Sequence, residues 1–146
     1  MNYLKDTITF VGNAIVDIIS QSSDETLRDL NIKKGSMQLI DEEMAEKFLT
    51  IIKNPTVISG GSAANTAVGF SSLGGCAYFV GQIGNDSYGD LFSRDINKSG
   101  VFFEKTENST KEKTSKSFIL VTPDAERSMN TFLGASAVSY THLRAH

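Results

Sequence analysis

The sequence predicts an α/β fold with a parallel sheet at its centre. Short segments rich in β-branched and aromatic residues alternate with longer segments of helical periodicity, the pattern of successive βα units. Glycine pairs, Gly60-Gly61 and Gly74-Gly75, follow one predicted strand and one predicted helix. Two stretches near residues 14–40 and 101–121 look antiparallel instead, and they predict a small accessory sheet.

The composition is typical of one globular domain. Of its 146 residues, 40% are hydrophobic and 21% are charged, which is enough apolar material for a core. A net charge of −3 and the lack of a basic stripe argue against nucleic-acid binding. No apolar run has the length of a membrane span and no signal peptide is recognisable, so we expect a cytoplasmic protein. A single cysteine, Cys76, agrees with a reducing compartment.

The first part of the chain predicts two strands, a short helix and an extended segment. β-Branched residues indicate the strands, which Gly12 separates. A turn at residues 33–35 follows the short helix. These elements are the strands Thr7–Val11 and Ile15–Ser20, the helix Asp24–Leu30 and the extended segment Ser36–Ile40.

A longer helix is predicted from Asp41 to about Lys53. Asp41 is a suitable N-cap, and Glu42 and Glu43 in the first turn complement the helix dipole. Apolar residues recur at helical spacing and define its buried side, namely Met44, Phe48, Ile51 and Ile52.

The remaining chain alternates strands with helices and ends in a hairpin. The segment Thr122–Glu126 has the composition of a turn between two strands. In chain order the predicted elements are the strand Thr56–Ser59, the helix Ala63–Leu73, the strand Ala77–Val80, the helix Tyr88–Ser99 and the strands Val101–Glu104, Thr114–Val121 and Ser128–Leu133.

The glycine pair before the second long helix is the most informative segment. Gly60 and Gly61 permit backbone angles closed to other residues and allow a ligand to approach the main chain. Ser62 is predicted to cap the helix, and Asn65 lies one turn further on. Such a turn suits a hydroxyl-rich or anionic small molecule. A plain Gly-Gly turn without a ligand is the alternative.

Several motifs in this order resemble the PfkB family, which contains ribokinase, fructokinases and adenosine kinase. The stretch Val80–Gly89 looks like the family's G-x-x-G-x-D-x-x-G segment, and Gly12–Asp17 looks like its first strand and substrate turn. The resemblance runs from about Ile8 to Ala137. The residues that match the N-terminal signature are Gly60, Gly61, Asn65, Ala67, Gly74 and Gly84.

The resemblance implies a ribokinase-like, doubly wound sheet with helices on both faces and a small β-sheet lid. Residues 1–137 would form the N-terminal part of such a kinase domain, with lid pieces near 14–40 and 101–121. Residues 138–146 lack clear periodicity and are interpreted as a foreign or frameshifted tail, with an unusual natural C-terminus as the alternative. The chain would then stop before the ATP-binding half.

The resemblance also assigns acceptor contacts to Asn13, Asp17, Gly60, Gly61 and Asn65. The Asp17 carboxylate can accept two hydroxyl hydrogens, and each asparagine amide can both donate and accept. For Asp17 the alternative is a solvated carboxylate at a strand end. For Asn13 it is a turn residue that tolerates left-handed angles.

Two further candidates lie outside the glycine turn. Met37 and Leu39 alternate with Gln38 and can form an apolar wall against a sugar ring or a base, or an ordinary strand of a lid or core. Arg127 follows the hairpin turn and can reach a substrate or a phosphate, or remain a surface arginine. His142 and His146 are assigned no metal.

The catalytic motif of the family is not found in this sequence. ATP and Mg²⁺ serve the full-length family, whose base and anion hole come from a C-terminal Asp-Thr-x-Gly-x-Gly-Asp string. That string does not occur here, so we assign no catalytic residue and expect neither ATP nor Mg²⁺ to bind this chain well.

The sequence therefore predicts the acceptor-binding half of a sugar or nucleoside kinase. Gly35-Ser36-Met37 followed by Leu39 leans towards the bacterial adenosine-kinase-like branch. A catalytically inactive fragment that binds a polyol or nucleoside is the alternative. The family also allows a homodimer through the lid of the full protein. A dinucleotide-binding domain is disfavoured, because neither glycine turn has the G-x-G-x-x-G spacing.

Overall fold

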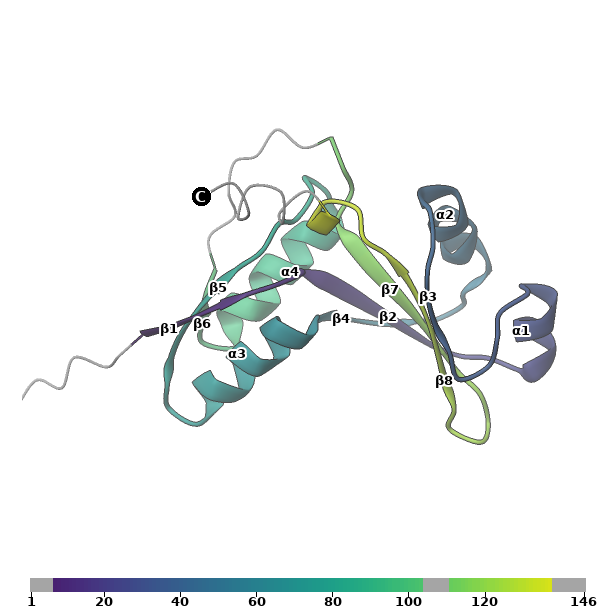
Figure 1. The fold of residues 1–146 in the computed structure, drawn as a ribbon, viewed down its shortest axis with the longest axis horizontal. Coiled ribbons are helices and arrows are strands. Elements are labelled where there is room, and N and C mark those ends of the chain that lie inside the picture. The colour runs from purple at the N-terminus through teal and green to yellow at the C-terminus, as the bar shows by residue number, and fades with distance from the viewer. Residues whose placement is uncertain (1–6, 104–110, 138–146) are drawn as a thin grey trace, which may run out of the picture.

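The computed structural model describes residues 7–103 and 111–137. Two sheets lie side by side in an elongated molecule, and helices α1 and α2 lie at the end opposite strand β1 (Figure 1). The chain crosses from one sheet to the other between β1 (Thr7–Val11) and β2 (Ile15–Gln21). This connection brings residues 12–14 to the junction of the two sheets.

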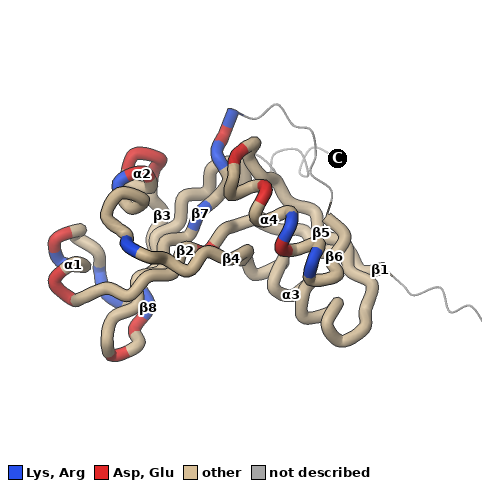
Figure 2. The backbone as a smooth tube through the Cα atoms, turned by 180° about the vertical axis from the view of Figure 1, so that it is seen from behind, with Lys and Arg blue, Asp and Glu red and all other residues tan. Residues whose placement is uncertain are grey.

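The first sheet is parallel and contains three strands of the described chain. Its order is β1, β5 (Cys76–Val80) and β6 (Val101–Phe102). None of these strands carries a charged residue, whereas α1 and α2 carry many (Figure 2). The segment β5–α4–β6 is a βαβ unit, which explains why β6 lies parallel beside β5.

Helices cover one face of this sheet in the described residues. Phe10 of β1 contacts Phe70 of α3 (Ser62–Ser72), with ring centroids 5.8 Å apart. Phe79 of β5 contacts Phe92 of α4 (Ser87–Lys98) at the same separation. On the opposite face Phe102 remains 60% exposed. The helices on both faces that the family resemblance implied are therefore not found within the described part.

The second sheet contains five strands in the order β3-β8-β7-β2-β4. β2 lies parallel to β7 and antiparallel to β4, and β7 pairs antiparallel with β8. The predicted hairpin about residues 122–126 is thus confirmed. The bounds of the other strands are Met37–Leu39 for β3, Thr56–Gly60 for β4, Ser115–Val121 for β7 and Arg127–Phe132 for β8.

The composition of the accessory sheet differs from its prediction in two ways. β6 pairs with β5 in the first sheet, so residues 101 and 102 do not belong to the accessory sheet. β4 was expected among the βα units of the main sheet, but it pairs antiparallel with β2, with Gly60 opposite Ile15. β4 therefore delivers the glycine turn directly to the start of β2.

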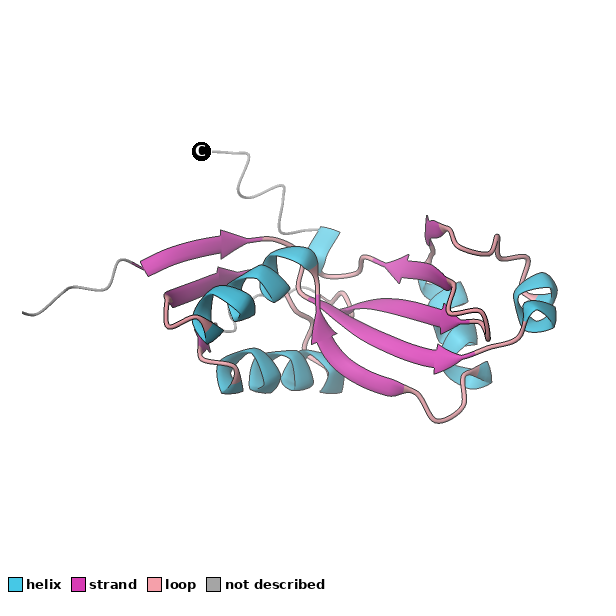
Figure 3. Cartoon of the chain, turned by 90° about the horizontal axis from the view of Figure 1, so that it is seen from below, coloured by secondary structure: helices cyan, strands magenta, loops and turns pink. Residues whose placement is uncertain are grey.

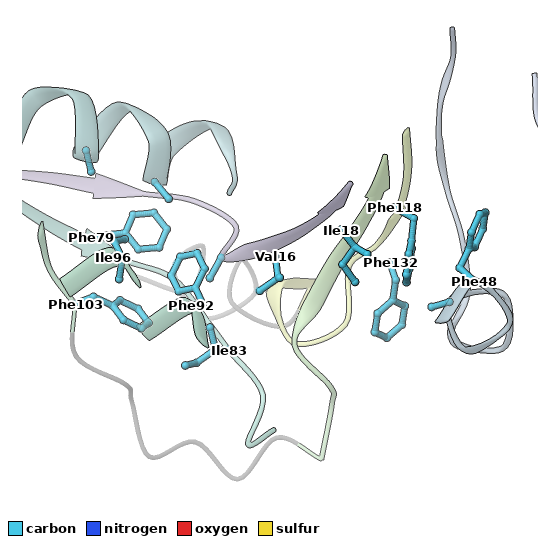
Figure 4. Close-up of a cluster of buried hydrophobic side chains, with 14 of the residues drawn as sticks. Val16, Ile18, Phe48, Phe79, Ile83, Phe92, Ile96, Phe103, Phe118 and Phe132 are labelled. Carbon is cyan, nitrogen blue, oxygen red and sulfur yellow. The ribbon is translucent and has the colours of Figure 1, made fainter. Parts of the chain in front are cut away.

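One face of the second sheet packs on α2 (Glu42–Ile51), and α1 (Asp24–Asp29) lies close to α2 (Figure 3). Phe48 of α2 stacks on Phe118 of β7, with centroids 5.0 Å apart and planes at 15°. Asp41 caps α2 as predicted, because its carboxylate accepts a hydrogen bond from the Met44 amide at 2.8 Å. In Figure 4, Val16 and Ile18 of β2 lie between this cluster and the one around Phe79.

Candidate functional site

The glycine turn joins β4 to α3 without a side-chain cap. Gly61 occupies the N-cap position with φ of 98°, and no side chain bonds to the first-turn amides. The prediction that Ser62 caps this helix is wrong, because Ser62 already lies within its first turn. The first amides of α3 are therefore left for water or a ligand.

Two close approaches bring the turn against the segment between β1 and β2. A Cβ atom on Gly61 would lie 2.5 Å from the Asn13 carbonyl oxygen. A Cβ atom on Gly12 would lie 2.6 Å from the Ala63 side chain. The glycines thus permit a contact between two backbones that any side chain would separate.

Asp17 lies over this turn. A Cβ atom on Gly60 would lie 2.5 Å from the Asp17 carboxylate carbon. The Asp17 side chain is half-buried, and burial raises the pKa of its carboxyl. It forms no hydrogen bond or ion pair with any other residue that the structure describes. A carboxylate that has lost water without gaining a partner is suited to bind hydroxyl donors.

Asn13 lies at the same junction, and Asn65 is less enclosed. The Asn13 side-chain oxygen is buried and has no hydrogen-bond partner in the described part. Asn65 is exposed on the first turn of α3, where its backbone amide donates to the Gly61 carbonyl at 2.8 Å. The structure therefore brings Asn13, Asp17 and both turn glycines together, with Asn65 exposed on the adjoining first turn of α3.

Two hydroxyls that sequence reasoning missed extend the polar group across the sheet. Ser117 is the register partner of Asp17 on the neighbouring strand, so both side chains point to one face. Ser117 pairs in turn with Thr131, and their hydroxyl oxygens lie 3.1 Å apart. The period-two spacing of the predicted hairpin was the signal for this pair, but the position of β2 on the other side of β7 was not predictable from it.

Apolar side chains on the same sheet face flank the polar row. Leu39 lies opposite Thr131, and Met37 lies opposite Met129. Met37 and Leu39 are each 62% exposed, whereas Gln38 turns to the other face and bonds to Asn130 at 2.7 Å. The predicted alternation is confirmed. Met37 and Leu39 form an exposed apolar strip on the face that bears Asp17, three strands away from it.

Arg127 lies further away on this face. It is exposed at the start of β8, opposite Val121, at the turn end of the hairpin. Thr131, in the Asp17 row, is four residues along the same strand, which corresponds to about 13 Å. The structure does not bring Arg127 next to Asp17.

The Gly84–Gly89 motif has a positioning role. Asp86 caps α4 by accepting from the Gly89 amide at 2.9 Å, and it also accepts from the Thr114 hydroxyl at 2.6 Å and the Thr114 amide at 2.9 Å. Burial opposes ionisation of Asp86, but these hydrogen bonds outweigh it and lower the pKa of the carboxyl. The motif thus fastens α4 to the residue before β7.

A buried lysine reinforces this junction. Lys116 of β7 is 2% exposed, and its ammonium lies 5.0 Å from the ring centre of Tyr88 on α4 and 5.4 Å from that of Phe132. It donates a hydrogen bond to the Thr114 carbonyl at 3.2 Å. Burial lowers the pKa of Lys116. The contact with Tyr88 connects β7, and hence the neighbouring Ser117, to α4.

A family model described as pfkB family carbohydrate kinase matches residues 11–145 of this chain. The chain is 35% identical over 112 residues to probable fructokinase-4 from Arabidopsis thaliana, which covers 75% of this chain and 34% of that relative. It is 33% identical over 78 residues to fructokinase from Escherichia coli, and this match covers 53% of this chain and 25% of that relative. The chain thus spans about a third or less of the length of these relatives.

Solved structures agree with this match and identify the fold as ribokinase-like. A probable sugar kinase from Rhizobium etli CFN 42 is 46% identical, with a TM-score of 0.81. The match covers 91% of this chain and 40% of the sugar kinase chain. Adenosine kinase from Sinorhizobium meliloti is 44% identical, with a TM-score of 0.77. The match covers 90% of this chain and 40% of the adenosine kinase chain. Residues 138–146, predicted as a foreign tail, lie outside the described residues, although the family match extends to residue 145.

Proposed function

Because the chain belongs to the pfkB family of carbohydrate kinases, we propose that it carries the acceptor-binding half of an ATP-dependent sugar or nucleoside kinase. The observation that carries this proposal is the half-buried, unpartnered carboxylate of Asp17 above Gly60. A neutral polyol must be held by paired donors and acceptors in a concave site. The junction of the two sheets supplies these groups.

Each residue of the site would have a separate task. Asp17 would accept hydrogens from two hydroxyls of the acceptor, which restores the solvation that burial removes. Asn13 would turn its buried, unpartnered side-chain oxygen towards a third hydroxyl of the acceptor, and Asn65 would contact the acceptor from the exposed first turn of α3. Gly60 and Gly61 would keep the backbone open to the ring. Arg127 would contact the acceptor only if the acceptor is long and carries an anionic group at its far end.

The exposed apolar strip favours a nucleoside over a simple sugar as the acceptor. Met37 and Leu39 lie on the face that bears Asp17, and a purine would cover this strip better than a hydroxylated ring. The likeness to an adenosine kinase at 44% identity supports this choice, while the fructokinase relatives keep a ketose as the second candidate.

No site for ATP or Mg²⁺ is assigned to this chain. The described residues contain no group of three or more His, Cys, Asp or Glu side chains that could hold a metal ion. The Asp-Thr-x-Gly-x-Gly-Asp string is missing from the whole sequence. No step of phosphoryl transfer is therefore assigned to this chain. A fragment that binds the acceptor without phosphorylating it is the alternative function.

A titration followed by amide NMR tests the acceptor site. Adenosine and fructose would each be added to the full 146-residue chain, to Asp17→Asn and to the control Asp29→Asn on the exposed surface of α1. We expect saturable shifts around residues 13–17 and 60–65 in the chain and the control, and a loss of at least tenfold in affinity for Asp17→Asn. Equal binding by both variants would contradict the assignment.

A second assay separates the two functions. Incubation with ATP, Mg²⁺ and adenosine should yield no phosphorylated product above a protein-free blank. Formation of a phosphorylated product would exclude the alternative that the chain binds the acceptor without phosphorylating it.

A homodimer and a cytoplasmic location are predictions that follow from the family resemblance and the composition. None of the helices in the described part has the length and apolar character needed to cross a membrane.

A further inference from the structure

A cavity lies behind the second sheet, between its covered face and helices α1 and α2. Its volume is about 490 Å³, within the range of small-molecule sites. Leu30 and Leu120 provide apolar walls, and Ser20, Ser22 and Thr26 provide hydroxyls. Lys53, which follows α2, completes the lining.

This cavity is separate from the acceptor site. Ser20 and Asp17 both belong to β2, but they are three residues apart, so their side chains point to opposite faces of the sheet. Leu120 is the register partner of Ser20 and shares its face. A ligand in the cavity would therefore be separated from Asp17 by the thickness of the sheet.

One hydroxyl of the cavity has no partner. The Ser22 hydroxyl is buried and forms no hydrogen bond with a described residue, which costs free energy in a folded protein. The other hydroxyls are engaged: Ser20 donates to backbone carbonyls, and Thr26 lies 3.0 Å from the α1 capping hydroxyl of Ser23. Ser22 lines the cavity, and rotation of its side chain about the Cα–Cβ bond would turn the hydroxyl towards a ligand there.

The lysine of the cavity is exposed and available to a ligand. Lys34 bridges two carboxylates, and Lys113 bridges two others. Lys53 forms no ion pair with any residue in the described ranges. An unpaired ammonium beside hydroxyls and an apolar wall has the chemistry that recognises a small anion with a hydroxylated carbon chain.

We propose that this cavity binds a small phosphorylated polyol, with Lys53 at the phosphate and the Ser22 hydroxyl at the carbon chain. The site goes beyond the proposed acceptor site and does not depend on it. The C-terminal dipole of α2 also favours a cation at Lys53. Only ligand binding therefore distinguishes a site from a helix-end charge.

Amide NMR of the full chain tests the proposal with sn-glycerol 3-phosphate as the probe. We expect saturable shifts at residues 20–26 and 51–53, at least tenfold weaker binding by Lys53→Met, and about threefold weaker binding by Ser22→Ala. The control Lys47→Met changes an exposed lysine of α2 that does not line the cavity and should bind like the parent chain. Asp17→Asn should also bind normally, which separates this result from failure of the acceptor site.

Two matched probes resolve the chemistry. Glycerol lacks the charge and should not saturate at the same concentrations, and inorganic phosphate lacks the carbon chain and should bind at least tenfold more weakly. Equal binding of inorganic phosphate and glycerol 3-phosphate would overturn the polyol assignment. Non-saturating shifts, or equal affinities for Lys53→Met and Lys47→Met, would overturn the site itself.

Discussion

The carboxylate of Asp17 lies directly above the Cα of Gly60, where a Cβ atom would come within 2.8 Å of its Oδ1 atom. The two residues belong to neighbouring antiparallel strands of the second sheet. The carboxylate can occupy this position only because residue 60 has no side chain. It also connects the turn before α3 to the polar row of Asp17, Ser117 and Thr131.

Gly60→Ala should displace the Asp17 carboxylate while the fold persists, because the obstructing atoms belong to a side chain that can rotate. We expect acceptor binding to weaken at least tenfold and the free energy of unfolding to fall by about 1 kcal/mol. Urea unfolding and the acceptor titration measure the two effects. Gly69→Ala is the matched control, since nothing lies within 4 Å of its Cβ, and should stabilise α3 by about 0.5–1 kcal/mol. Unchanged acceptor binding in Gly60→Ala would contradict the steric argument.

Gly61→Ala should destabilise the chain more strongly. Its φ of 98° disfavours a side chain, and a Cβ atom would also meet the Asn13 backbone, which cannot move freely. Gly74→Ala isolates the first effect, because its φ is 88° and its Cβ would meet nothing within 4 Å. We expect about 1–2 kcal/mol for Gly74→Ala, and at least about 1 kcal/mol more for Gly61→Ala. Chemical denaturation measures the free energy of unfolding of both variants. Equal losses would show that the contact with the Asn13 backbone adds nothing to the cost of the positive φ.

The stability of the chain should depend on the ionisation of Asp17. Burial raises the pKa of this carboxyl in the folded state, so its favourable contribution is fully present below the unfolded pKa and is lost as pH rises through the folded one. Asp17→Asn removes this loss. The free energy of unfolding of the variant minus that of the parent chain should therefore increase from pH 3 to pH 7.

Urea midpoints at several pH values provide that difference. Other carboxyls do not disturb it, because both proteins retain them. Asp124 is an example: hydrogen bonds from Lys34 and Thr122 lower its pKa to about 2. A difference that stays constant with pH would mean that Asp17 is solvated in the folded chain.

Phe48→Ala should be among the most destabilising substitutions in this chain. Phe48 is 1% exposed and stacks on Phe118, so its removal leaves a cavity between α2 and the second sheet. We expect a loss of about 3–5 kcal/mol in the free energy of unfolding. Phe102→Ala removes the same ring from a site that is 60% exposed, and should change this free energy by about 0.5 kcal/mol or less. Comparable losses would indicate that the α2 contact is not part of the cooperative core.

Local signals identified most of the elements and several of their ends. The Asp41 cap, the helical spacing around Phe48 and the turn after Val121 each depend on residues close in sequence. The acceptor candidates came from the family resemblance, and the structure places Asn13, Asp17 and the glycine pair together. Arg127 was expected nearby but lies at the far end of the same sheet face.

The sequence by itself determined where strands, helices and turns form, because hydrophobic periodicity, caps and glycines act over a few residues. Only the tertiary structure decided that β4 joins β2 rather than the first sheet, and that Ser117 and Thr131 continue the Asp17 row. Strand partners are chosen by burial and backbone hydrogen bonding between distant segments. That choice converts separate candidate residues into one site.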